Sequence, residues 1–136
     1  MKNEHFVIEA NNPVSAFLFE YSTPTLAYNK AKKLGKISGS IETFDELSEV
    51  LVRSKFDKYV SLEKRLKLIN DFKELLILFT VSGKITDCRD TKDNKYLELA
   101  VASNALCIIT GDKYLLVLHP FRGIPILTAA DFLNEF

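Results

Sequence analysis

The sequence predicts an α/β domain of three layers, in which helices cover both faces of a central, mostly parallel sheet of about five strands. Two observations predict this fold class. Short apolar runs alternate with helical patterns along the chain, as is typical of parallel strands joined by crossover helices. The length of 136 residues suits one domain with a proper core, so we assign residues 1–136 to a single domain.

The predicted strands are short apolar runs. They cover residues 6–8, 36–40, 76–81, 105–110 and 124–127. Between them, apolar residues spaced three and four apart indicate helices. The predicted helices are one that begins near Pro13, one that restarts at Ser22-Thr23-Pro24 and stops at Gly35, others over about 43–53, 61–76, 93–103 and 112–117, and a last one from Thr128. Pro13 suits a first helical turn and Gly35 suits a helix end, so both boundaries have a physical cause.

Composition narrows the class of protein. Hydrophobic residues make up 47% of the chain and charged residues 26%, which is typical of a globular protein. No apolar run approaches the roughly 18 residues that span a membrane, and residues 1–5 do not resemble a signal peptide. Cys88 and Cys107 are too few for a disulfide framework. Because Cys107 lies in a strand pattern, we expect it to be a buried thiol in a cytoplasmic protein without membrane contact. Because the formal net charge is zero, any nucleic-acid contact must come from a local patch.

Three acids lie at places where a ligand site is expected. Asp93 opens the helical pattern of residues 93–103, and Asp112 follows the apolar run of residues 105–110. Glu9 directly ends the first strand. Open parallel sheets bind ligands beyond the carboxyl ends of their strands, so Glu9 and Asp112 are expected at the same edge. An acid at a helix start and an acid at a strand end, one βα unit apart, can converge on one divalent cation.

The two aspartates also have an ordinary structural explanation, whereas Glu9 is harder to explain in that way. Aspartate is a preferred N-cap, so Asp93 and Asp112 can each cap the helix that follows. Asp87 and Asp90 lie in a polar loop, where we expect them to be solvated.

A fourth acid, Glu46, lies on the predicted helix of residues 43–53. It falls at the edge of the polar sector beside Val50, so it can point into a crevice. The alternative is a solvated acidic face, on which Glu49 and Arg53 pair four residues apart.

The four acids suit a hard cation. Mg²⁺ and Mn²⁺ take oxygen ligands and keep several waters, so a few carboxylates suffice without histidine or cysteine. Such ions can activate a water and stabilise the leaving oxygen of an in-line displacement. The sequence does not have the residue patterns of other common catalytic or binding sites. His5 and His119 show no metal-ligand or catalytic-triad spacing, no glycine-rich phosphate loop is present, and Ser15 has no nucleophile elbow.

At these positions the sequence resembles the PIN-domain family, in particular its bacterial toxin branch of the VapC type. Glu9-Ala10-Asn11 followed by Ser15 is similar to the family's Asp-x-Asn and serine after the first strand. Residues 46–51 (Glu-Leu-Ser-Glu-Val-Leu) resemble its central helix. The two most specific matches are residues 90–95 (Asp-Thr-Lys-Asp-Asn-Lys) and residues 110–116 (Thr-Gly-Asp-Lys-Tyr-Leu-Leu). The resemblance covers nearly the whole chain.

The resemblance implies a Mg²⁺- or Mn²⁺-dependent RNA endonuclease, with a cognate antitoxin that blocks its site and frequent homodimers. The catalytic, metal-binding acids it implies are Glu9, Glu46, Asp93 and Asp112. Supporting residues are Asn11, Ser15 and Thr110. Basic side chains near these acids are candidate RNA contacts, namely Arg53, Lys55, Lys92, Lys95 and Lys113.

Two departures from the family pattern define an alternative. Position 9 is Glu where the family has Asp, so the carboxylate reaches further by about 1.5 Å. Position 114 is Tyr where a second acid is usual. A fold with weakened catalysis that serves as a protein-binding module is therefore the second hypothesis. A phospho-acceptor receiver domain would share the sheet, but the paired acids after its first strand and the lysine after its last are not in this sequence.

Overall fold

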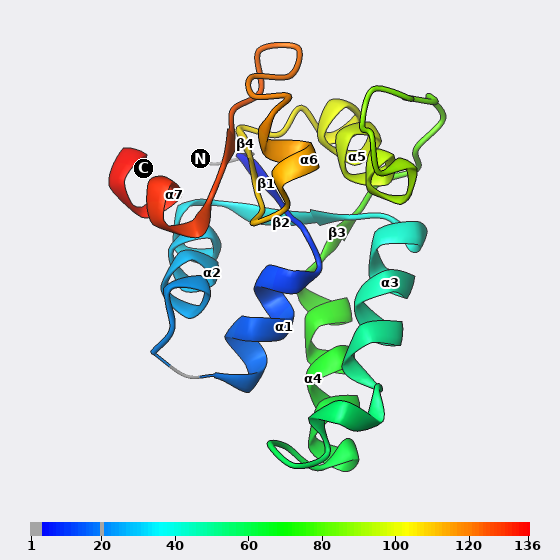
Figure 1. Cartoon of the computed structure of the whole chain (residues 1–136), viewed down its shortest axis with the longest axis vertical. Coiled ribbons are helices and arrows are strands. Elements are labelled where there is room, and N and C mark those ends of the chain that lie inside the picture. The colour runs from blue at the N-terminus through cyan, green and yellow to red at the C-terminus, as the bar shows by residue number, and fades with distance from the viewer. Residues whose placement is uncertain (1–3, 20) are drawn as a thin grey trace.

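The computed structural model describes residues 4–19 and 21–136, and its elements follow the predicted alternation of strands and helices (Figure 1). The strands are β1 (His5–Ile8), β2 (Lys36–Gly39), β3 (Ile77–Leu78), β4 (Cys107–Ile109) and β5 (Ile126–Leu127). The helices are α1 (Asn11–Leu18), α2 (Thr23–Leu34), α3 (Ile41–Leu51), α4 (Leu62–Leu75), α5 (Asn94–Ser103), α6 (Lys113–Leu116) and α7 (Ala129–Glu135). Two short 3₁₀ turns, η1 (Ser54–Phe56) and η2 (Thr91–Asp93), precede α4 and α5. Among the described helices, none has the length and apolar character needed to cross a bilayer.

The strands form one sheet in the order β3-β2-β1-β4-β5, and all of its strand pairings are parallel. From β1 the chain builds outward to β2 and β3, then returns to place β4 on the other side of β1. The neighbours β1 and β4 are therefore followed by segments that leave in opposite directions. Ligand sites of open α/β sheets form at such a switch point. The predicted parallel sheet of about five strands is confirmed.

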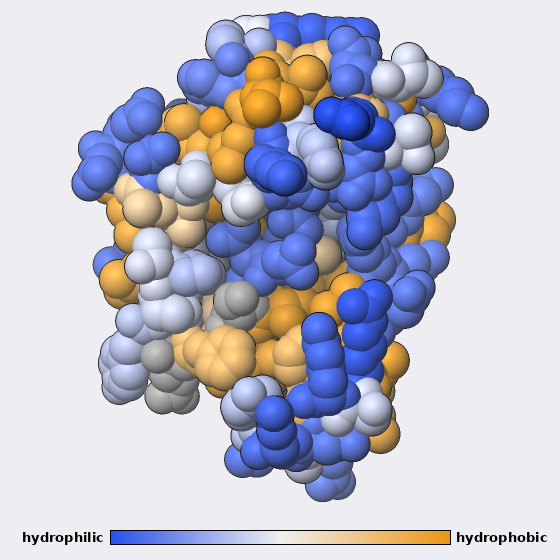
Figure 2. Space-filling view, viewed as in Figure 1, coloured by the Kyte–Doolittle hydropathy of each residue, from blue (hydrophilic) through white to orange (hydrophobic). Residues whose placement is uncertain are grey.

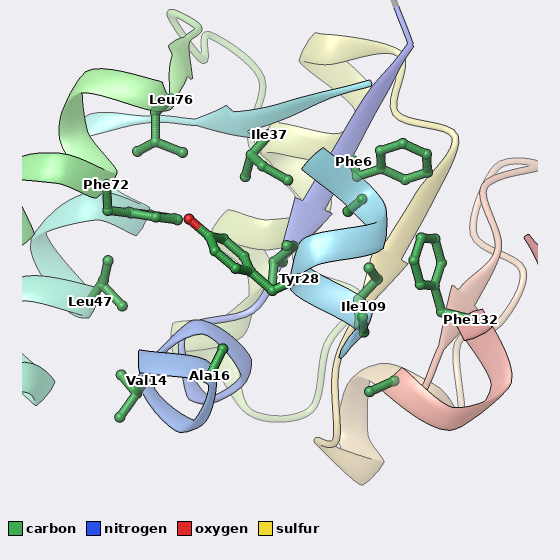
Figure 3. Close-up of a cluster of buried hydrophobic side chains, with 14 of the residues drawn as sticks. Phe6, Val14, Ala16, Tyr28, Ile37, Leu47, Phe72, Leu76, Ile109 and Phe132 are labelled. Atoms are coloured by element: carbon green, nitrogen blue, oxygen red, sulfur yellow. The ribbon is translucent and has the colours of Figure 1, made fainter. Parts of the chain in front are cut away.

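Alternating side chains of the strands fill two apolar cores. On β1, Phe6 and Ile8 face one side and Val7 faces the other. The first side packs against α1, α2, α3, α4 and α7, with Tyr28 and Phe72 near its centre (Figure 3). The second side packs against α5 and α6. Because the strands are buried on both faces, their sequences read as continuous apolar runs, and the predicted three layers are confirmed.

The strand β3 is shorter than predicted. It covers Ile77–Leu78 instead of residues 76–81, and residues 79–90 form no regular element. As an edge strand it pairs only with β2, and its two side chains are largely exposed. The loop that follows is held against α5 by two side chains: Glu98 accepts from the Ile85 N–H (2.9 Å) and Asn94 accepts from the Cys88 N–H (2.8 Å). These bonds carry the loop to the start of α5.

Arg65 closes the end of α3. Its side chain is fully buried and donates to the carbonyl oxygens of Leu51 (2.8 Å), Arg53 (3.1 Å) and Val60 (3.0 Å), and it pairs with Asp57. The last carbonyls of a helix have no partner within the helix, so Arg65 supplies donors that the backbone lacks. The turn from α3 to α4 is fixed by this one side chain.

Candidate functional site

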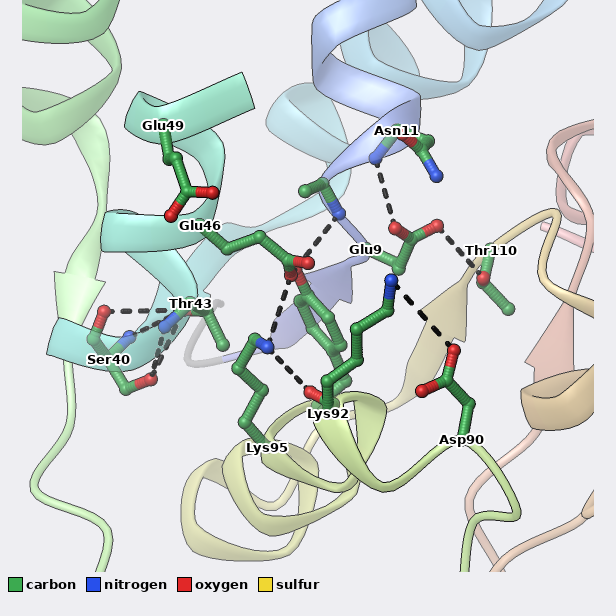
Figure 4. Close-up of polar contacts among 12 residues, drawn as sticks. Glu9, Asn11, Ser40, Thr43, Glu46, Glu49, Asp90, Lys92, Lys95 and Thr110 are labelled. Carbon is green, nitrogen blue, oxygen red and sulfur yellow. Dashed lines mark hydrogen bonds and ion pairs between the residues drawn. The ribbon is translucent and has the colours of Figure 1, made fainter. Parts of the chain in front are cut away.

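Glu9 and Thr110 lie at the switch point, where β1 and β4 end side by side. The Glu9 N–H donates to the Ile109 carbonyl (3.0 Å), which extends the strand pairing by one residue. The Thr110 hydroxyl, which is fully buried, donates to Glu9 Oε1 (3.2 Å) and accepts from the Asp112 N–H (3.0 Å). Thr110 thus links Glu9, which follows β1, to the backbone of Asp112, which follows β4. Figure 4 shows the bond from Thr110 to Glu9.

The Glu9 carboxylate is buried, and both of its oxygens have a donor. Oε1 accepts from Thr110, and Oε2 accepts from the Asn11 N–H (3.1 Å). Burial raises the pKa of Glu9, while these two hydrogen bonds act to lower it. Asn11 supports the site through its backbone, and its side chain is exposed. The side chain of Ser15, the other predicted supporting residue of this loop, lies outside the described part of the structure.

Three aspartates bring their carboxylates together on the facing side of the site. One oxygen from each of Asp90, Asp93 and Asp112 lies within 4.8 Å of the others. Asp93 and Asp112 were predicted to converge, and the structure brings them together. Asp90 was predicted to be solvated, and its side chain is 32% exposed; it also reaches this group, because Asn94 and Glu98 hold its loop against α5. Glu9 and Glu46 are not members of this group of three.

The capping explanation applies to only one of the predicted pair. Asp112 Oδ1 accepts from the Tyr114 N–H (2.8 Å), so it caps α6. Asp93 stands at the N-cap position of α5, yet its side chain makes no capping hydrogen bond. Instead Asp93 is 2% exposed, and its Oδ2 has no hydrogen-bond partner among the described residues. A buried carboxylate oxygen without a donor is costly, which sets Asp93 apart from a structural cap.

The crowding of these acids changes their protonation. Burial, together with the neighbouring Asp112 carboxyl, raises the pKa of Asp93 to about 8. Burial would also raise the pKa of Asp112, but hydrogen bonds from Asp93 and from the backbone N–H groups of Tyr114 and Leu115 hold it below its ordinary value. Two carboxylates in contact repel when both are ionised. Without a cation, the pair therefore retains one proton near neutral pH.

Glu46 points from α3 across the cleft toward α5 (Figure 4). The hydroxyl of Tyr96, a fully buried residue, donates to Glu46 Oε1 and accepts from the Ala10 N–H (3.2 Å). The ammonium group of Lys95 lies 3.4 Å from the same Glu46 oxygen. Tyr96 lies on the apolar side of the predicted helix, and its spacing alone does not indicate a role for its hydroxyl group. The only sequence signal is its position three residues after Asp93.

A charged cleft of about 510 Å³ continues from Glu46 along α3. Three of the five predicted RNA contacts line it, namely Arg53, Lys92 and Lys95. The predicted pair of Arg53 with Glu49 is present, at 3.8 Å. Lys55 and Lys113 are not among the lining residues. Their ammonium groups instead lie over the rings of the next residue in each case, at 5.1 Å and 5.3 Å.

The residues present fit a divalent cation of the Mg²⁺ type. All the candidate donors are carboxylate oxygens, which such ions prefer. The buried Oδ2 of Asp93, which has no partner among the described residues, and the raised pKa of Asp93 are both explained if a cation normally neutralises this group. The observation that supports a metal is therefore the lack of a hydrogen-bond donor to Asp93 Oδ2 among the described residues.

Comparison with known proteins agrees with this geometry. The family model described as PIN domain matches residues 5–114. The uncharacterised protein MJ1680 of Methanocaldococcus jannaschii is 38% identical over 91 residues, which cover 60% of this chain and 58% of that protein. The chain thus matches somewhat more than half the length of this curated relative.

Two solved structures have a similar fold. VapBC2 from Rickettsia felis, bound to a DNA fragment from their promoter, superposes with a TM-score of 0.58 at 19% identity, over 90% of this chain and 96% of that one. PAE2754 from Pyrobaculum aerophilum gives a TM-score of 0.62 at 14% identity, over 96% of this chain and 88% of that one. At these identities the two structures establish a shared fold.

Proposed function

This chain belongs to the PIN-domain family, and from that premise we propose that it is a Mg²⁺- or Mn²⁺-dependent RNA endonuclease acting in the cytoplasm. The observation that carries the proposal is the buried Asp93 carboxylate, which has an unpartnered oxygen beside Asp112 at the sheet's switch point. Glu9, Glu46, Asp93 and Asp112 are the proposed catalytic and metal-binding acids. Thr110 and Asn11 hold Glu9 in place.

The chemistry divides between the ion and the chain. When bound, a divalent ion lowers the pKa of a water and neutralises charge on a phosphodiester. The aspartates of the site would hold that ion, and Tyr96 and Lys95 fix Glu46 on the opposite wall. Arg53, Lys92 and Lys95, which line the adjoining cleft, are the proposed contacts to RNA phosphates. Binding through such contacts weakens as the salt concentration rises.

We also propose an antitoxin-type protein partner and a homodimer. The partner is supported by the fold shared with VapBC2 of Rickettsia felis and by an apolar groove between α1, α2 and α4. The groove has a volume of about 330 Å³, and its lining includes Phe17, Tyr28, Phe72 and Leu75. Figure 2 shows apolar surface on this face, below the polar area. Light scattering of the purified chain, alone and with the product of an adjoining small gene, tests both proposals.

The test of the nuclease is cleavage of RNA with Mn²⁺, with EDTA, and by an Asp93→Asn, Asp112→Asn double variant. We expect cleavage only with metal and only by the unaltered chain. Both substitutions keep the side-chain shape, and the amide introduced at position 112 retains an oxygen able to cap α6. Cleavage that persists in EDTA or in the double variant would contradict the proposal.

A protein-binding module with weakened catalysis is the second candidate. One observation favours it: hydrogen bonds engage both oxygens of Glu9, and Tyr96 and Lys95 engage Glu46. Absence of cleavage of any RNA in the presence of metal would support this candidate. A Glu9→Asp variant that then gains activity would identify the longer acid as the cause.

A further inference from the structure

We infer that Asp90 is a third protein ligand of the divalent ion, beside Asp93 and Asp112, and that Glu9 and Glu46 act on this ion through water. The inference rests on the proposed function, since it concerns the ion of the same site. It adds a residue that was expected to be solvated, and it gives the two walls of the site different tasks.

The first argument is geometric. Two oxygens bound to one Mg²⁺ at about 2.1 Å are at most about 4.2 Å apart. One oxygen from each of Asp90, Asp93 and Asp112 already lies within 4.8 Å of the others. A shift of less than about 1 Å therefore brings all three into a common coordination sphere. Mg²⁺ and Mn²⁺ commonly keep several waters, so three carboxylates leave room for solvent and substrate.

The second argument is that Asp90 has no sufficient structural task. It stands at the N-cap position of η2, but its side chain makes no capping hydrogen bond. By contrast, Ser22, Ser40, Ser61, Asp112 and Thr128 all cap their helices with a side-chain oxygen. The contact of Asp90 with Lys92, at 3.9 Å, joins two partly exposed side chains. Such pairs contribute little to stability, and a divalent ion readily displaces the lysine.

The third argument is independent of the cluster's spacing. Asp93 is 2% exposed, and its Oδ2 lacks any donor in the described structure. A cation between Asp93 and its two neighbours supplies the missing partner. On the other wall, both oxygens of Glu9 and the Oε1 atom of Glu46 already have donors from Thr110, Asn11 and Tyr96. Those oxygens are better placed to accept from bound waters than to replace their donors with an ion.

The test is Mn²⁺ binding to the full chain, followed by the electron paramagnetic resonance signal of the free ion. The variants are Asp90→Asn and the control Asp87→Asn, which alters an exposed acid of the same loop outside the group. We expect Asp90→Asn to weaken Mn²⁺ binding about tenfold or more, and Asp87→Asn to change it less than about twofold. Thermal melts without metal verify that both variants fold.

The outcomes separate this inference from the proposed function. If Asp90→Asn binds Mn²⁺ within about twofold of the unaltered chain while RNA cleavage remains metal-dependent, the inference fails and the nuclease stands. If Asp90→Asn weakens Mn²⁺ binding as expected but the unaltered chain cleaves no RNA, the proposed nuclease function fails and the assignment of Asp90 as a ligand stands. An unaltered chain that binds no Mn²⁺ overturns both.

Discussion

The two walls of the acidic site differ in how their carboxylates are satisfied. On the wall built by β1 and α3, donors from Thr110, Asn11 and Tyr96 engage Glu9 and Glu46. On the wall built around the start of α5, Asp90 and Asp93 make no capping bonds, and one Asp93 oxygen has no donor among the described residues. A carboxylate whose oxygens have donors is held in a fixed place, whereas a carboxylate oxygen without a donor is available to a cation. From this difference we infer positioning for one wall and ion binding for the other.

The largest expected effect is on the ion-binding wall. Asp93→Asn removes the charge from the buried acid at its centre, and we expect RNA cleavage to fall by about 100-fold or more. Initial rates of cleavage in saturating Mn²⁺ measure this change. Asp71→Asn is the control, because Asp71 is an exposed acid that pairs with Lys67 far from the site. If the cleavage rate of the Asp93 variant falls by less than about tenfold, Asp93 is not at the centre of the catalytic site.

The positioning wall is tested by Tyr96→Phe. The substitution removes the hydroxyl that joins Glu46 to the Ala10 N–H, so a buried donor loses its acceptor. We expect the free energy of unfolding to fall by about 1–2 kcal/mol, measured by urea denaturation. Tyr59→Phe, at a residue that is 54% exposed, should leave it nearly unchanged. Equal stability of the Tyr96 and Tyr59 variants would show that the hydroxyl does not hold this wall.

Stability should respond to pH on the ion-binding wall. The pKa of Asp93 is raised from 3.8 to about 8 in the folded chain, so folding favours its protonated form. The metal-free protein should then lose stability as pH rises between these two values. Asp112, with its lowered pKa, acts with the opposite sign and only at more acid pH.

The same reasoning predicts that Asp93→Asn stabilises the metal-free protein at pH 8, by about 1 kcal/mol. The amide can donate to Asp112 without taking up a proton. Urea denaturation at pH 5 and pH 8 measures the effect, and added Mn²⁺ should reverse the order of the two proteins. A variant that is less stable than the unaltered chain at pH 8 would argue against repulsion in this group.

The smallest effect is expected outside both walls. Glu49→Gln breaks the pair with Arg53, whose side chains are 78% and 50% exposed. We expect the free energy of unfolding to change by less than about 0.5 kcal/mol. A larger loss, measured in the same urea series, would mean that the effect of an acidic residue on stability does not depend on how buried that residue is.

Much of the fold could be predicted because burial on both faces leaves a clear pattern. The apolar runs before Glu9 and Thr110 mark β1 and β4, and Gly35 and Thr128 mark helix boundaries in the structure as in the sequence. The edge strand β3 was predicted too long. Its apolar residues resemble those of a central strand, but β3 has only one neighbouring strand, β2, and the pairing covers two residues.

The site was less predictable, since its decisive contacts join distant residues. The sequence places Asp93 and Asp112 at the right ends of their elements. It does not show that residues 79–90 fold back through Asn94 and Glu98, which is what delivers Asp90. Nor does an apolar helical pattern distinguish the buried hydroxyl of Tyr96 from a phenylalanine.

The link from Thr110 to Glu9 spans 101 residues of sequence, and this separation bears on synthesis of the chain. A nascent chain that has formed β1 and α3 holds Glu9 and Glu46 but lacks the aspartates that follow. The acidic group can assemble only after translation has passed residue 112 and β4 has inserted beside β1. Long-range pairings of this kind form late in folding. The acidic site therefore stays incomplete until the sheet has closed.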